Sequence, residues 1–191
     1  MKKSIHISLV TNLSKIIKGC KAGKNDARGA LYRMFSSKFY AICLRYSGNE
    51  EDAKDILQEG FIKIFDKIKQ FSGKGSFEGW MVRIMINTAL EKYRTRHFLH
   101  NSDQEPVSIA ENFSVEVTDD LSVNELLGII QELSPQYRMV FNLYAIEGYS
   151  HKEISQMLHI SEGTSKSNLA RARGILQQKV KKHYSEAKQI I

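Results

Sequence analysis

The stretch that decides the fold is SHKEISQMLHISEGTSKSNLARARGIL, residues 150–176. Ser150 and Glu153 have the spacing of a capping box, which predicts that a short helix begins here. Residues 159–161 should then turn the chain, because His159 tolerates a positive φ better than most residues do. A longer helix follows, with apolar residues at helical spacing: Leu169, Ala172, Ile175, Leu176 and Val180. Two helices joined by a tight turn are typical of the helix-turn-helix motif.

In that motif the second helix enters the major groove of DNA, and its N-terminal side chains reach base edges. The side chains expected opposite Leu169 and Leu176 carry donors that suit phosphates and the edges of guanine or adenine. We therefore predict that this helix binds DNA through Lys166, Ser167, Asn168, Arg171 and Arg173. An ordinary helical hairpin with a solvated basic face has the same spacing and is the alternative.

Helical spacing of apolar residues continues through nearly the whole chain, over four stretches before residue 97 and four after residue 121. Only two prolines occur in 191 residues, which also favours long helices over a turn-rich β protein. Between the two sets of helices the periodicity fades, and polar and acidic residues indicate a flexible linker. The expected fold is all-α: two small helical bundles, residues 1–97 and 122–187, joined by an acidic flexible linker, residues 98–121. The second bundle contains the helix-turn-helix.

The net charge of +7 is unevenly distributed. Residues 1–96 hold 19 basic and 9 acidic side chains, and residues 138–191 hold 9 basic and 4 acidic ones. Residues 97–137 hold 8 acidic side chains and no Lys or Arg. Two basic blocks separated by an acidic one predict two modules that bind a polyanion and are joined by a tether. Chance segregation of surface charge is the alternative.

Enzyme signatures are scarce in the sequence. It contains no Gly-rich phosphate loop, no zinc-protease motif and no serine elbow, and its six histidines are scattered. Cys20 and Cys43 are too few for a disulfide framework or a four-cysteine zinc site, so we expect two buried thiols. We accordingly expect no enzymatic activity, no metal, no cofactor and no small-molecule substrate.

The sequence also argues against a membrane protein. No apolar run approaches the ~20 residues that a membrane-spanning helix needs. Lys2 and Lys3 are followed by the polar residues Ser4, His6 and Ser8, which makes the N-terminus a poor signal peptide. We expect no membrane insertion and a cytoplasmic location.

A helix with a one-sided polar face is expected after Asn49, a good N-cap residue followed by three acidic residues. Asp52, Asp55 and Glu59 are spaced i, i+3 and i+7, so they should share one exposed face of this helix. Catalytic carboxylate pairs need two groups that face each other across a cleft. Three carboxylates on one exposed face are more typical of a surface that binds a partner.

Three segments resemble conserved motifs of bacterial sigma factors. Residues 52–61 (DAKDILQEGF) look like the polymerase-binding motif, and residues 80–89 (WMVRIMINTA) resemble the promoter-melting segment that follows it. Residues 162–173 are similar to the helix-turn-helix of sigma region 4. The motifs occur in the family's order and at family-like spacing, and a linker replaces the third domain of larger sigma factors. The sequence is identified as a member of the extracytoplasmic-function (ECF) group of the sigma-70 family.

The resemblance implies partners and site residues. Core RNA polymerase, through its β′ clamp helices and its β subunit, is expected to bind Asp52, Asp55, Gln58 and Glu59. The minus-10 promoter element, with a base flipped into the loop 71–76, is expected to contact Phe71, Ser72, Gly73, Lys74, Arg83, Asn87, Lys92, Arg94 and Arg96. The minus-35 element is expected to contact the helix-turn-helix residues named above. An anti-sigma factor is a further implied partner.

The residues alone, without the resemblance, leave two other functions open. A stand-alone helix-turn-helix regulator would bind DNA without polymerase, but it has no use for Gln58, Glu59 or the Gly-rich loop. A nucleic-acid-processing enzyme would need catalytic groups that converge, and the sequence offers no such set.

Overall fold

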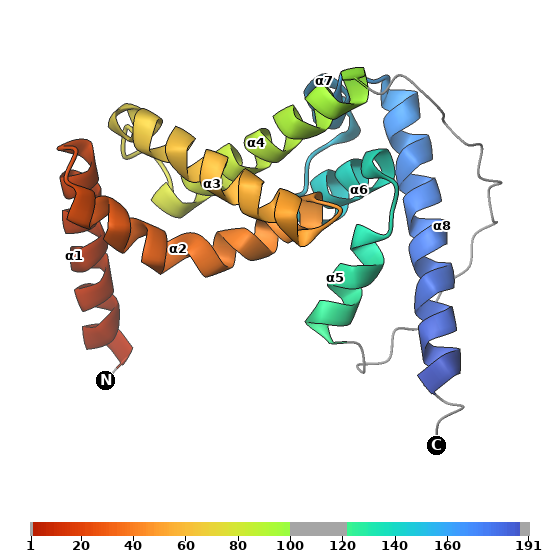
Figure 1. Cartoon of the computed structure of the whole chain (residues 1–191), viewed down its shortest axis with the longest axis horizontal. Coiled ribbons are helices and arrows are strands. Elements are labelled where there is room, and N and C mark those ends of the chain that lie inside the picture. Colours follow the sequence, from red (N-terminus) through yellow and green to blue (C-terminus); the bar gives the residue numbers. More distant parts are fainter. Residues whose placement is uncertain (1, 100–121, 188–191) are drawn as a thin grey trace. The chain divides into compact units, whose positions relative to one another are not determined.

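The computed structural model describes residues 2–99 and 122–187, which form helices and short connections with no strand among them (Figure 1). This agrees with the all-α, two-domain fold expected from the sequence. Most of the predicted linker, residues 100–121, lies outside the described residues. Residues 98 and 99, assigned to the linker above, belong instead to the last turn of a helix.

The helices follow one another in this order: α1 (Lys2–Lys21), α2 (Asn25–Tyr46), α3 (Glu50–Lys67), the 3-10 turn η1 (Ile68–Gln70), α4 (Phe77–Leu99), α5 (Val123–Gln131), α6 (Pro135–Phe141), the π-helical turn η2 (Asn142–Ile146), α7 (His151–Leu158) and α8 (Glu162–Ala187). None of these helices, over the residues described, is long and apolar enough to cross a membrane.

The chain divides into two compact units. Unit 1 consists of residues 1–43 and 53–88, and unit 2 consists of residues 44–52 and 89–191. Residue 1 of unit 1, and residues 100–121 and 188–191 of unit 2, lie outside the described residues. The ends of α2 and α4 and the first turn of α3 therefore belong to the same unit as α5 to α8.

The core of unit 1 is built from large apolar side chains that are fully buried, among them Leu31, Phe39, Ile64, Met81 and Met85. Phe61 is the centre of an aromatic cluster, with ring centroids 4.7 Å from Tyr32 and 5.8 Å from Phe39. Gly60 lets α3 approach α4 closely, since a Cβ at this position would overlap the Met85 Sδ atom. Cys20 and Cys43 are buried as predicted, and burial raises the pKa of the Cys43 thiol to about 12.

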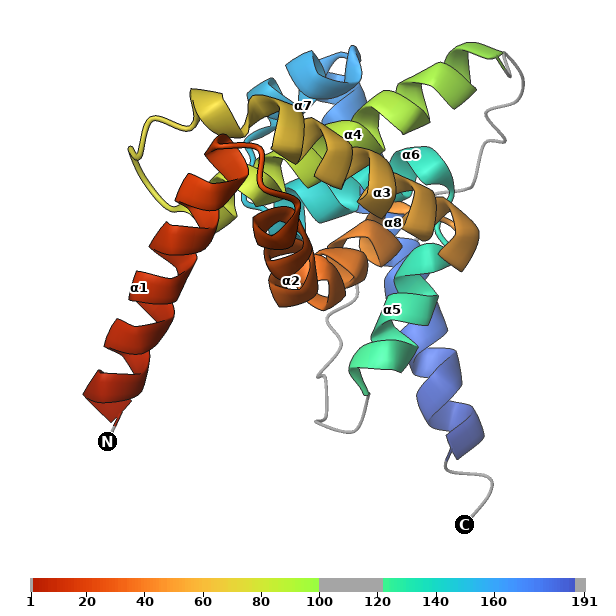
Figure 2. The same cartoon turned by 60° about the vertical axis from the view of Figure 1, so that its left-hand side comes forward.

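In unit 2, α6 packs against α8, and α5 and α7 also lie along α8 (Figures 1 and 2). One apolar cluster joins α5, α6 and α8, and it consists of Ile129, Ile130, Leu133, Tyr137, Ala172 and Leu176. The predicted capping box at the start of α7 is present, because the Glu153 amide donates to Ser150 Oγ and the Ser150 amide donates to the Glu153 carboxylate. His159 has a φ of 55°, so the helix-turn-helix turn forms as predicted.

Candidate functional site

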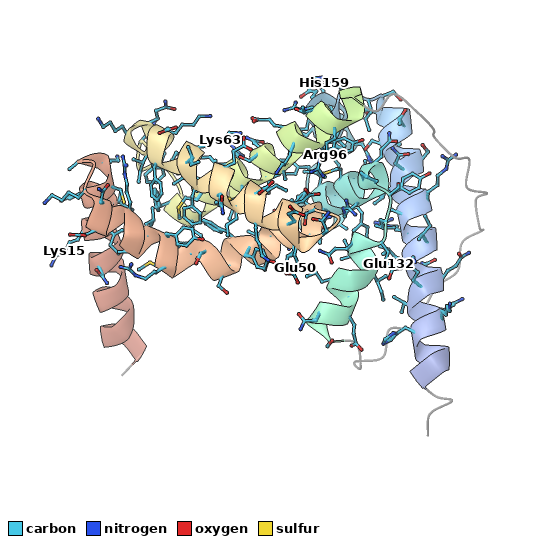
Figure 3. All side chains as sticks on the ribbon, in the orientation of Figure 1. Lys15, Glu50, Lys63, Arg96, Glu132 and His159 are labelled. Atoms are coloured by element: carbon cyan, nitrogen blue, oxygen red, sulfur yellow. The ribbon has the colours of Figure 1, made fainter. Side chains whose placement is uncertain are left out.

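The polar face of α3 is only partly as the sequence indicated. Asp55, Gln58 and Glu59 are exposed, and Glu59 forms an ion pair of 2.7 Å with Lys63 on the next turn (Figure 3). Asp52, however, is only 9% exposed, so placing it on the exposed face was wrong. The exposed carboxylate and amide face of α3 therefore begins at Asp55, about one turn after Asp52.

Asp52 is buried because other side chains bind it. Arg96 of α4 (Figure 3) donates from Nη1 and Nη2 to the two carboxylate oxygens, each at 2.5 Å. The Asn49 side chain caps the helix by accepting a hydrogen bond from the Asp52 amide at 2.8 Å. Hydrogen bonds from Arg96 hold the pKa of the Asp52 carboxyl below its usual range, with a smaller contribution from Asn49. Asp52 thus stays ionised, and it fixes Arg96 to the first turn of α3.

The loop between η1 and α4 contains two glycines in a left-handed conformation and begins at a cluster of three aromatic rings. Gly73 and Gly75 have φ values of 80° and 81°, a left-handed conformation that favours glycine. Phe71 is half-buried, with its ring centroid 5.0 Å from Phe77 and 5.6 Å from Trp80. Residues 72–76, which follow Phe71 in the loop, are exposed. The loop combines accessible backbone with a face on which a base could stack.

Lys21 places a positive charge beside Phe71, the first residue of this loop. Its ammonium group donates to the Phe71 carbonyl at 2.8 Å and lies 5.8 Å from the centre of the Phe71 ring. A cation over a ring face is favourable, so Lys21 helps to orient Phe71. This role of Lys21 could not be predicted from the sequence, because a residue fifty positions away from Phe71 gives no local signal of the contact.

A stripe of polar residues on α4 continues from the loop. Trp80, Arg83 and Asn87 are spaced i, i+3 and i+7, so they follow one another along one side of the helix. Trp80 is half-buried, and Arg83 and Asn87 are exposed, as is Lys74 in the loop. The predicted minus-10 residues of unit 1 thus share a loop and the adjoining helix face, where donors and an amide are available to a nucleic acid.

The basic residues at the end of α4 have partners within unit 2. Arg96 is the ion-pair partner of Asp52, and Lys92 is half-buried and contributes a positive charge near the same carboxylate. Arg94 Nη1 lies 3.4 Å from the Met157 carbonyl oxygen and 3.3 Å from His159 Nε2. The Arg96 side chain is nevertheless 56% exposed, so the contact of Arg94 and Arg96 with DNA phosphates stays a prediction.

The first turns of α8 present an exposed polar surface. Ser161 caps the helix by accepting a hydrogen bond from the Thr164 amide at 2.9 Å. Lys166, Ser167 and Arg173 are exposed, and the Arg173 guanidinium lies 5.7 Å from the centre of the Tyr144 ring. Their exposure is as expected, and their contact with DNA stays a prediction.

Asn168 differs from the expectation, and Arg171 is less exposed than Lys166 and Ser167. Asn168 is only 4% exposed, because it lies one helical turn from Ser165 and Ala172, which are fully buried. Placing Asn168 on the exposed face was therefore wrong. Arg171 is half-buried, and its Nη1 lies 3.4 Å from the Tyr137 hydroxyl of α6.

Models of two protein families match the chain. Sigma-70 region 2 matches residues 31–98, and Sigma-70 region 4 matches residues 124–176. The first match contains the α3 face, the loop and the α4 stripe, and the second contains the helix-turn-helix. The motifs that carried the resemblance lie inside these two matches.

Similar proteins include two bacterial sigma factors and one solved structure. The ECF RNA polymerase sigma factor SigE of Mycolicibacterium smegmatis is 32% identical over 83% of the chain, which spans 63% of that relative's length. SigW of Bacillus subtilis, also an ECF RNA polymerase sigma factor, is 30% identical over 88% of the chain and 97% of its own length. Sigma factor RpoE of Bartonella quintana, solved with the anti-sigma factor NepR, is 21% identical over 91% of the chain and 97% of its own, with a TM-score of 0.47. By its two family matches and its likeness to SigW, the chain belongs to the ECF group of the sigma-70 family of RNA polymerase sigma factors.

Proposed function

We propose that the chain binds core RNA polymerase through α3, directs it to promoters through α8, and melts the minus-10 element with the 71–76 loop and α4. The polymerase surface consists of Asp55, Gln58 and Glu59. The minus-10 surface consists of Phe71, Ser72, Gly73, Lys74, Arg83 and Asn87, and the minus-35 surface consists of Lys166, Ser167 and Arg173. Residues 1–97 and 122–187 are the proposed functional domains.

The observation that carries this proposal is the exposed carboxylate and amide face of α3, which lies on the same chain as an exposed basic helix-turn-helix. A regulator that bound only DNA would need the second feature alone. Carboxylates and amides suit an Arg-bearing partner, because charge-assisted and bidentate hydrogen bonds to guanidinium groups are strong. The protein is proposed to act without catalysing a reaction itself, in the cytoplasm, where an anti-sigma factor is a further proposed partner.

Transcription in vitro separates this function from its alternatives. Runoff transcription from promoter DNA is measured with core polymerase, with and without the protein. We expect transcription that depends on the protein. A protein that binds the DNA but adds no transcript would be a stand-alone regulator, and a change in the DNA itself without polymerase would indicate an enzyme.

The double variant Asp55→Lys with Gln58→Ala should bind core polymerase at least about tenfold more weakly, because about 1.4 kcal/mol of lost interaction has this effect. Both side chains are exposed, so stability should change by no more than about 0.5 kcal/mol. Affinity is measured by titrating labelled protein with core polymerase. The matched control is Asp66→Lys with Gln70→Ala, which makes the same changes at exposed positions farther along the chain. Equal losses for the two pairs would indicate a charge effect and contradict the proposed face.

Lys166 and Arg173 should contribute differently to minus-35 binding. Lys166 lies in the second turn of α8, where helix-turn-helix side chains reach bases, so Lys166→Ala should relax preference at one base position. Arg173 lies farther along the helix, where it is expected to contact a phosphate. Arg173→Ala should therefore weaken binding to all promoter sequences equally, and it should reduce the slope of log affinity against log salt concentration by about one. Binding titrations with single-base promoter variants at several salt concentrations measure both. Arg33→Ala, which removes an exposed arginine of α2, is the control. If Arg173→Ala instead weakens binding to some promoter sequences more than to others, Arg173 contacts a base and its assignment to a phosphate is wrong.

A further inference from the structure

A cavity of about 410 Å³ lies in unit 1, where the turn between α1 and α2 approaches the end of α3 (Figures 1 and 2). Small-molecule sites have volumes of roughly 300–1,000 Å³, so one small ligand fits here. The lining includes three cations, Lys21, Arg28 and Lys69, and one carboxylate, Asp66. None of the lining residues belongs to the polymerase, minus-10 or minus-35 surfaces proposed above.

The turn beside the cavity has a fixed backbone. The Gly23 amide donates to the Cys20 carbonyl at 2.9 Å, and the Lys24 amide donates to the Gly19 carbonyl at 3.0 Å. Gly23 has a φ of 77°, a left-handed conformation that glycine adopts readily at the end of a helix. Gly19 lets α2 pass close to α1, since a Cβ at residue 19 would lie 2.6 Å from the Ala27 Cβ. One wall of the cavity is therefore shaped by backbone before any ligand binds.

The charge of the lining favours an anion. Three cations and one carboxylate give the lining a net charge of +2. The Cys20 thiol stays neutral, because burial raises its pKa and the charge of Arg28 offsets only part of this rise. In the part of the chain that the structure describes, Asp66 forms no ion pair with the three cations. The lining therefore matches a single phosphate group, which carries a charge of about −1.5 to −2 at neutral pH.

Arg28 is half-buried and, among the described residues, has no carboxylate partner. Its guanidinium carbon lies 5.6 Å from the centre of the Phe65 ring, and its Nε is buried with no hydrogen-bond partner in the described chain. A charged donor that has lost water without gaining an acceptor costs free energy. An anion at the guanidinium would offset this cost, and the planar guanidinium also offers a surface on which a base can stack.

Lys21 and Lys69 connect the cavity to the loop 71–76. An ammonium group has three donors, and Lys21 uses one of them for the Phe71 carbonyl. Lys21 forms no second hydrogen bond to any residue that the structure describes. Lys69 is exposed in η1, two residues before the loop. Both ammonium groups therefore have donors available for a phosphate.

We propose that this cavity binds a nucleotide with one phosphate. Lys21, Arg28 and Lys69 hold the phosphate, and the base stacks on the Arg28 guanidinium. Two sources share this chemistry: a free nucleotide, and a nucleotide of the DNA strand displaced at the minus-10 element. The second source rests on the proposed function, in which the neighbouring loop holds a flipped base of that strand.

Amide chemical shifts in NMR titrations of the full chain test the site. The probes are adenosine 5′-monophosphate, adenosine and inorganic phosphate. We expect shifts concentrated at residues 20–23 and 65–69. The monophosphate should bind at least about tenfold more tightly than either fragment, because its phosphate and base are held together. Equal affinities for the monophosphate and inorganic phosphate would leave the base without a role, and shifts spread over other basic surfaces would show an adventitious ion only. Either result would overturn the proposal.

Two charge-matched double variants separate the site from general electrostatics. Arg28→Gln with Lys69→Gln removes two cations of the lining, so it should weaken monophosphate binding about tenfold or more. Arg33→Gln with Lys67→Gln makes the same change in charge at exposed positions of α2 and α3. This control should change the affinity less than about twofold, because salt screens exposed charges outside the site. Equal losses in the two double variants would contradict a built site.

Single variants keep the test valid if the first double variant does not fold, which circular dichroism reveals. Lys69 is exposed, so Lys69→Gln should fold normally and weaken monophosphate binding about threefold. Arg28→Lys keeps the charge but removes the planar guanidinium. It should retain binding of inorganic phosphate and lose most of the advantage of the monophosphate. An unchanged advantage would show that no base stacks on Arg28.

A single-stranded DNA that carries the minus-10 element distinguishes the two sources. If the strand shifts the same amide signals and displaces the monophosphate, the cavity binds the displaced strand. If the strand shifts only the signals of the loop 71–76 and leaves the monophosphate in place, the cavity binds a free nucleotide. A strand that does not bind at all would count against the proposed minus-10 surface and not against the cavity. Normal strand binding without any monophosphate binding would overturn the cavity site alone.

Discussion

Replacing Gly60 by alanine is expected to lower the free energy of unfolding of unit 1 by about 1–2 kcal/mol. Two effects compete at this position. Alanine favours a helix over glycine by roughly 0.5–1 kcal/mol, whereas forcing extra volume into a packed core costs about 1–3 kcal/mol. The second effect should prevail, because the new Cβ would overlap the sulfur of Met85, which is fully buried and cannot swing into solvent.

Urea denaturation followed by tryptophan fluorescence measures this change. Trp80 is the single tryptophan of the chain and lies in unit 1, so its signal reports the unit that contains Gly60. Gly79→Ala is the control, since its Cβ would meet only Ser76, at an ordinary 3.7 Å. It should leave unit 1 as stable as before or slightly more stable. A Gly60→Ala variant that is more stable than the original would show that α3 and α4 can separate without cost.

Local features of the fold could be predicted because the signals are local. The capping box at Ser150 and the turn at His159 depend on backbone geometry within four residues, and both form as expected. The periodicity of apolar residues likewise placed the helices, although α4 extends to Leu99, beyond the predicted boundary. A helix boundary inside a polar stretch carries no apolar signal, which explains this difference.

The exposure of individual polar residues could not be predicted in the same way. Asp52 has the same helical spacing as the exposed carboxylates of α3, but Arg96, more than forty residues away, binds it. Asn168 is polar and yet belongs to the buried stripe of α8, beside Ala172. Arg138 is charged and yet occupies a buried position in α6. In each case the packing of the folded chain overrides the usual preference of a polar side chain for water.

Asn87→Ala should reduce open-complex formation about tenfold while polymerase and minus-35 binding remain unchanged. The reason is the order of events, because Asn87 and the 71–76 loop can contact a base only after the minus-10 duplex begins to part. Flipping a base costs a few kcal/mol of stacking and pairing energy, which the protein must offset. One good amide–base pair contributes roughly 1–3 kcal/mol to that compensation. The Asn87 side chain is exposed, so its loss should change stability by less than about 0.5 kcal/mol.

Permanganate footprinting of melted thymines measures the open complex, and protection of the minus-35 element measures binding. A promoter with an unpaired minus-10 base should restore part of the loss in Asn87→Ala, because the cost of opening has already been removed. Asn12→Ala, which changes an exposed asparagine of α1, should melt the promoter normally. If Asn87→Ala also melts the promoter normally, the α4 stripe does not hold the flipped base. If pre-melted DNA restores nothing, Asn87 acts at a step other than opening. A partial rescue confined to Asn87→Ala would place its amide at the base that leaves the duplex, because only that contact depends on whether the base is already free.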